Sequence, residues 1–131
     1  MVRTRLSAIL ALLILMTAPL HAQYIEIYRL DNIARDLPEP EALGKLATHL
    51  SVSADSLKQE KAEYKATIGE LYMGHQLAKL SNSDFKVLMT EFKSGKAWGV
   101  LAKEKNVNMD QVRKDSRQLE NTLKKTQRAA K

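Results

Sequence analysis

Apolar residues recur at intervals of three and four through most of this chain, which is the period of an α-helix that packs on one side. The clearest stripe lies in residues 85–92. Residues 43–50, 98–102 and 109–123 carry similar stripes, and residues 68–80 are apolar on more than one side. The pattern predicts an all-α, compact bundle of about five to seven short helices, with residues 68–80 as the central helix.

Polar residues and prolines divide these stripes into separate helices. Pairs at the spacing of a capping box, in which two residues satisfy each other's backbone N–H groups, indicate three helix starts. They are Thr67 with Glu70, Ser81 with Asp84, and Asn108 with Gln111. Pro38 and Pro40 precede another helix, and Gly95 and Asn106 are suited to end one in a left-handed conformation.

Residues 24–36 fit two kinds of secondary structure. Ile25, Tyr28 and Ile33 lie near helical spacing, whereas Ile25 and Ile27 alternate with their neighbours as in a strand. We expect a helix, and the strand stays open from the sequence alone.

Two stretches resemble each other at a constant offset of 55 residues. The sequence LGKLATHLSVSADSLK, from Leu43, aligns without a gap with WGVLAKEKNVNMDQVR, from Trp98, and five of the 16 positions are identical. Ser53 and Asn108 occupy the position of a helix N-cap in the two copies. The alignment predicts two helix-turn-helix-like hairpins, the second of which continues into a long amphipathic C-terminal helix.

The first residues have the order of an export signal. Two arginines precede an apolar run of 11 residues, 6–16, and Ala22 ends a segment suited to a signal peptidase, with Ala18 as the alternative cleavage point. The run is shorter than the about 20 apolar residues of a transmembrane helix. We therefore expect a cleavable signal peptide over 1–22, a single helical domain over 23–131, a periplasmic or secreted location, and no transmembrane segment after cleavage.

Charge is concentrated near the C-terminus. The chain has 21 Lys and Arg against 15 Asp and Glu, and residues 113–131 hold seven of the bases but two of the acids. Such a basic tail can bind anionic lipid, a cell-wall polymer or nucleic acid. Alternatively, it is only a solvated helix end, where cations are favoured near the helix C-terminus. The chain has no cysteine, which excludes disulfides, thiolate metal sites and cysteine nucleophiles.

The segment GELYMGHQLAKLSNSDFKVLMTEFKSGKAWGVLAKEKNV, from Gly69 to Val107, resembles a pattern found in small exported bacterial proteins of uncharacterised function. The pattern joins a GELY helix, an LAK segment, SGK followed by an aromatic residue and glycine, and AKE before a turn. That turn usually holds glycine where Asn106 stands here, and asparagine tolerates the same left-handed geometry. The resemblance implies an exported helical protein and brings no activity with it.

Residues 98–112 also resemble the helix-turn-helix segments of bacterial repressors, through Ala102, Val107 and Val112. In that interpretation the helix from Met109 would read DNA. The candidates for polyanion contacts are Arg113, Lys114, Arg117, Lys124 and Lys125. Export would take the chain away from the chromosome, so nucleic-acid or polyanion binding is the alternative function and not the leading one.

No catalytic pattern is evident, because His49 and His75 belong to no metal-binding or triad motif and Glu60 fits a solvated helix face. We expect no enzyme, no cofactor and no metal. Trp98 is a candidate for a partner groove, although closure of the core over nearby aromatic residues is the favoured interpretation. Leu119 and Leu123 extend an apolar seam suited to a helical partner. The sequence thus predicts a non-enzymatic interaction module that engages an unknown protein or envelope component.

Overall fold

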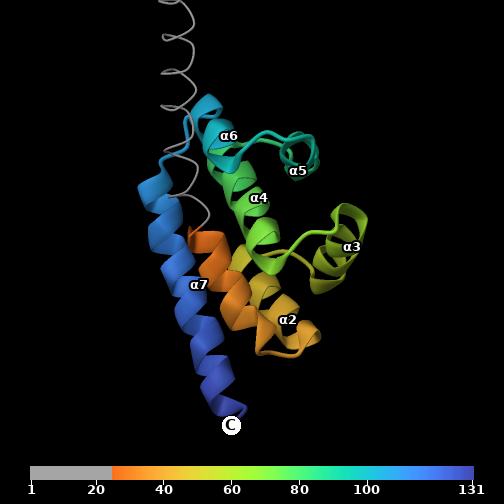
Figure 1. Cartoon of the computed structure of the whole chain (residues 1–131), viewed down its shortest axis with the longest axis vertical. Helices are drawn as coiled ribbons and strands as arrows, with labels where there is room; N and C mark the ends of the chain where they lie inside the picture. Colours follow the sequence, from red (N-terminus) through yellow and green to blue (C-terminus); the bar gives the residue numbers. More distant parts are fainter. Residues whose placement is uncertain (1–24) are drawn as a thin grey trace, which may run out of the picture.

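The computed structural model describes residues 25–131, and within that range the secondary structure is helical throughout, with short connections (Figure 1). Residues 25–35 are helical, and six further helices follow. These are α2 (Glu39–Leu50), α3 (Ala54–Tyr64), α4 (Ile68–Ser81), α5 (Phe85–Lys93), α6 (Trp98–Glu104) and α7 (Met109–Ala129). The predicted all-α bundle is confirmed, and a strand over residues 25–35 is excluded. The predicted signal peptide, 1–22, lies outside the described residues.

Helix α4 is the centre of the bundle and packs against α2, α3 and α5. Its buried positions cover every side of the helix, and they include the consecutive residues Leu71, Tyr72 and Met73, each fully buried. Two glycines let neighbours approach its backbone closely. A Cβ at Gly69 would lie 2.7 Å from Ile27, and a Cβ at Gly74 would lie 2.7 Å from the ring of Phe85. The predicted central helix is therefore confirmed.

The helix starts match one of the three predicted pairs completely and a second at its N-cap residue alone. Thr67 and Glu70 form a complete capping box at the start of α4. Asn108 is the N-cap of α7, where its side chain accepts from the backbone N–H of Asp110. The predicted pairing of Ser81 with Asp84 is wrong, because Ser81 is the last residue of α4 and Asp84 is itself the N-cap of α5.

The same three-residue turn precedes four of the helices, namely α3, α4, α5 and α7. Each turn begins with a left-handed residue, continues with a residue whose N–H bonds to a carbonyl five residues earlier, and ends with an N-cap residue. The left-handed residues are Ser51, Lys65, Asn82 and Asn106, with φ between 49° and 56°. The corresponding N–H donors are those of Val52, Ala66, Ser83 and Val107, at 2.8–3.1 Å. Both segments aligned at the 55-residue offset place this turn between two helices, but the turn is the general connector of this bundle.

Helix α7 is the longest of the described helices, at 21 residues, and runs along one edge of the bundle (Figure 1). It packs against α2, and two polar contacts tie it to the segment at residues 25–36. Arg113 pairs with Glu26 near one end, and Gln127 donates to Asp36 further along. The residue numbers of both partners increase from the first contact to the second, so the helix at 25–35 runs parallel to α7. None of the described helices is long and apolar enough to cross a membrane.

Candidate functional site

The outward face of α7 carries a concentration of cationic side chains. All five basic residues predicted for polyanion contact lie on this helix, and two more, Arg128 and Lys131, lie at or just beyond its end. Lys114, Arg117, Lys125 and Arg128 are exposed. The opposite face of α7 is buried in the bundle through Val112, Ser116, Leu119 and Leu123. The helix is therefore amphipathic, with its apolar side used by the fold and its basic side facing solvent.

Ion pairs occupy two of the predicted cations. Arg113 lies 2.6 Å from Asp110 and 3.5 Å from Glu26, and Lys124 lies 2.8 Å from Glu120. Among residues 25–131 no acidic side chain pairs with Lys114, Arg117, Lys125, Arg128 or Lys131, and residues 1–24 contain no Asp or Glu. These five cations are available to an external anion.

Four of the available cations share one stripe along the helix, which we call the basic row: Lys114, Arg117, Lys125 and Arg128. Their spacing of three, eight and three residues places them on one side of an α-helix, with Asn121 in the central gap. At a rise of about 1.5 Å per residue, the row extends over about 21 Å. The site is thus elongated, and its axis is that of α7.

The helix dipole explains only part of this charge. Cations are favoured near the C-terminus of a helix, where Arg128 lies, and disfavoured near the N-terminus. Lys114 and Arg117 lie in the first half of α7, where that benefit is absent. They are also neighbours at a spacing of three residues, an arrangement in which like charges destabilise a helix. The benefit of the helix dipole, which is one part of the solvated-end alternative, therefore applies to Arg128 and not to Lys114 and Arg117.

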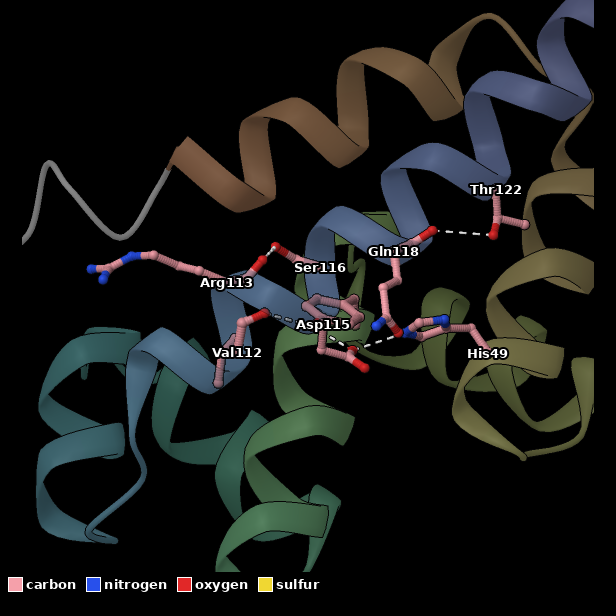
Figure 2. A network of polar contacts seen from close by, with 8 residues as sticks. His49, Val112, Arg113, Asp115, Ser116, Gln118 and Thr122 are labelled. Atoms are coloured by element: carbon pink, nitrogen blue, oxygen red, sulfur yellow. Dashed lines mark hydrogen bonds and ion pairs between the residues drawn. The ribbon is translucent and has the colours of Figure 1, made fainter.

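The inward side of α7 holds a polar cluster in which three helices meet (Figure 2). Asp115 accepts from the Tyr72 hydroxyl of α4 and from Nε2 of His49 of α2, each at 2.8 Å and each at Oδ2. The carbonyl oxygen of Val112 lies 3.1 Å from the same hydroxyl. Burial of Tyr72, together with the neighbouring Asp115 carboxylate, raises the pKa of its hydroxyl. The cluster fixes the rotation of α7, since Asp115 can face inward only if Lys114 and Arg117 face solvent.

No local pattern in the sequence predicts this cluster, because Asp115 is 43 residues from Tyr72 and 66 residues from His49. The second histidine is similar. His75 lies 2.7 Å from a carboxylate oxygen of Glu60 and stacks on Phe85 at a centroid distance of 3.9 Å. Glu60 was expected on a solvated face, and the structure corrects this, because its side chain is only 17 % exposed against His75. Both histidines join helices to one another.

The apolar candidates lie inside the domain. Trp98 is 2 % exposed and stacks on Phe92 at 4.2 Å between ring centroids, so its ring belongs to the core. Leu119 and Leu123 have no exposed area, because the bundle itself fills the seam of α7. These three side chains therefore present no surface to a partner in this conformation. The basic face of α7 is the part of the predicted site that remains accessible.

A groove of about 690 Å³ lies where the helix at 25–35 meets α2, α3 and the start of α4. Its walls carry charges of both signs, and three of the five charged residues have partners within the described part of the chain. Lys61 lies 3.2 Å from Glu39, and Asp31 accepts from the backbone N–H of Gly69 at 2.7 Å. Burial raises the pKa of the Asp31 carboxyl, although the Gly69 N–H opposes this shift. The groove thus mixes acidic and basic side chains, whereas the basic row holds cations alone.

Comparison with protein families, with curated proteins and with solved structures finds no match to this chain. Within residues 25–131, no group of three metal-ligating side chains is arranged to hold a metal ion. A functional interpretation therefore depends on the geometry of this molecule alone.

Proposed function

We propose that this protein is an exported, non-enzymatic module that binds a polyanionic component of the cell envelope through the basic row on α7. The proposal rests on the two opposite faces of α7. Its apolar face is buried, and its unpaired cations face solvent over about 21 Å. Electrostatic attraction to a polyanion releases counterions, and this supplies most of the affinity of such contacts.

Export is part of the proposal and depends on the N-terminal sequence. Two arginines, the apolar run at 6–16 and Ala22 have the order of a cleavable signal. Expression of the full chain, fractionation of the cells and mass spectrometry of the product test it. A product that begins near Gln23 outside the cytoplasm supports export. An uncleaved cytoplasmic product contradicts export and makes nucleic acid the polyanion to consider first.

The binding part is tested with fluorescent dextran sulfate, a generic linear polyanion, by anisotropy at low salt. One variant replaces the four residues of the basic row by glutamine. Its control replaces Lys58, Lys79, Lys86 and Lys103, which are exposed on other helices, and so has the same net charge. We expect the basic-row variant to lose at least about tenfold in affinity and the control to lose much less. Equal losses in the two variants would contradict a localised site.

A further inference from the structure

We infer that the ligand of the basic row is a single linear phosphodiester chain that lies parallel to the axis of α7. This inference rests on the proposed function and specifies its partner. A planar membrane and a nucleic-acid duplex are also polyanionic, and the geometry of the row favours the linear phosphodiester over both of them. A carboxylate polymer, which an arginine fork binds in the same way, is distinguished by the experiment below.

The shape of the row sets the shape of the ligand. Its cations form one line about 21 Å long on a single stripe of the helix. Phosphates in one stacked nucleic-acid strand are about 3.4 Å apart along the axis and further apart when the strand is extended, so about six phosphates or fewer span the row. Arg117 and Arg128 add guanidinium forks that bind phosphate through two hydrogen bonds, and lysines act as point charges between them.

The chemistry of the outward face argues against insertion into a bilayer. Stable binding at a membrane interface uses an apolar helix face that enters the headgroup region. The apolar face of α7 is instead consumed by the bundle, and the residues between the cations of the row, including Gln118, Asn121 and Thr122, are polar. The helix also has no aromatic residue on which a base could stack, so contacts are with the backbone of the ligand and independent of sequence.

The geometry also argues against a duplex held as in helix-turn-helix repressors. Those proteins read the major groove with the first residues of the second helix. Here Arg113, at that end of α7, is engaged by Asp110 and Glu26, whereas the unpaired cations continue to the C-terminus. The turn before α7 is also not specialised, because the bundle uses it four times.

The experiment measures the binding of labelled oligothymidylates of increasing length, with a polymer of glycerol phosphate as the second phosphodiester. We expect affinity to rise at least about tenfold between two and eight nucleotides and by only a small factor from eight to 16, because the row is then filled. Glycerol phosphate polymer should bind comparably, which would indicate recognition of the shared backbone. Tighter binding of one of the two would identify which source the site prefers.

Three controls separate the inference from the proposed function. Polygalacturonate of matched charge, a DNA duplex and vesicles rich in phosphatidylglycerol should each bind more weakly per charge than the phosphodiester chain. If one of them binds as tightly, and the basic-row variant abolishes that binding, the proposed function stands and the inference is wrong. If no polyanion binds, both are wrong. An affinity that rises beyond eight nucleotides by more than the number of overlapping binding registers would contradict a site of finite length.

Discussion

Asp115 of α7 accepts a hydrogen bond from the buried hydroxyl of Tyr72 of α4, with 2.8 Å between the two oxygens. The bond joins the helix that carries the basic row to the centre of the bundle. The adjacent residue, Lys114, is exposed on the other side of the helix. The contact therefore links the packing of the core to the orientation of the basic face.

Replacement of Asp115 by alanine should lower the free energy of unfolding by about 1–2 kcal/mol, because the Tyr72 hydroxyl loses an acceptor in a buried setting. The carbonyl of Val112, at 3.1 Å, limits the loss. Urea unfolding followed through the fluorescence of Trp98, the single tryptophan of the chain, measures it. Asn121→Ala, at an exposed position of the same helix, is the control and should change stability little. An Asp115→Ala variant as stable as the wild type would show that the contact does not hold α7.

Stability should fall at alkaline pH through Tyr72. The pKa of its hydroxyl is raised in the folded state, so the unfolded chain ionises first, near pH 10, while the folded protein keeps the proton. The contribution is present below pH 10 and is lost as pH rises, by up to about 1.4 kcal/mol per pH unit. A Tyr72→Phe variant lacks this term. Denaturation between pH 9 and 11 should therefore show a steeper decline for the wild type, and parallel declines would contradict it.

Substitution by alanine should lower the stability of the protein at one glycine and raise it at another. A Cβ at Gly74 would lie 2.7 Å from the Phe85 ring, so Gly74→Ala should destabilise the fold by about 1–3 kcal/mol. Nothing lies within 4 Å of a Cβ at Gly44, inside α2, so Gly44→Ala should stabilise by about 0.5–1 kcal/mol. Thermal unfolding of the two variants checks the signs. A stable Gly74→Ala protein would mean that α5 does not pack on α4 as described.

Removal of charge at the start of the basic row should raise the stability of the protein and lower its affinity for a polyanion. Replacing Lys114 and Arg117 by glutamine relieves the like-charge repulsion between them, so the free protein should gain a few tenths of a kcal/mol. Affinity for oligothymidylate should fall in the same variant. Calorimetry gives the first quantity and anisotropy the second. Loss of stability together with affinity would indicate a structural role for these two side chains.

Local sequence patterns predicted most of the fold. The Thr67 and Glu70 capping box, the left-handed Asn106 and the apolar stripes depend on residues within a few positions of one another, and each is present. The predicted pairing of Ser81 with Asp84 failed because both residues suit a helix cap and both lie at the same turn. Asn82 takes the left-handed position there. The sequence revealed the recurrence of this turn only in the two stretches offset by 55 residues, because the residues that flank the turn are partly identical there.

The sequence predicted which basic residues belong to the candidate site but not how they are arranged and paired. The sequence identified the basic residues of α7, but it did not separate Arg113 and Lys124, which are paired, from Lys114, Arg117 and Lys125. Glu26, which pairs with Arg113, comes from a segment that is 87 residues away in the chain. The seam of Leu119 and Leu123 could equally have served a partner or the core, and only the packing of the bundle decides between them.

The salt dependence of binding tests the central claim most directly. The association constant for a 16-nucleotide oligothymidylate would be measured from 20 to 200 mM salt for the wild type and for four single glutamine variants of the basic row. For four neutralised phosphates, the slope of log K against log salt should be about −3, and each variant should reduce its magnitude by about 0.7. A slope near zero, or one that all four variants leave unchanged, would show that the basic row does not bind a polyanion.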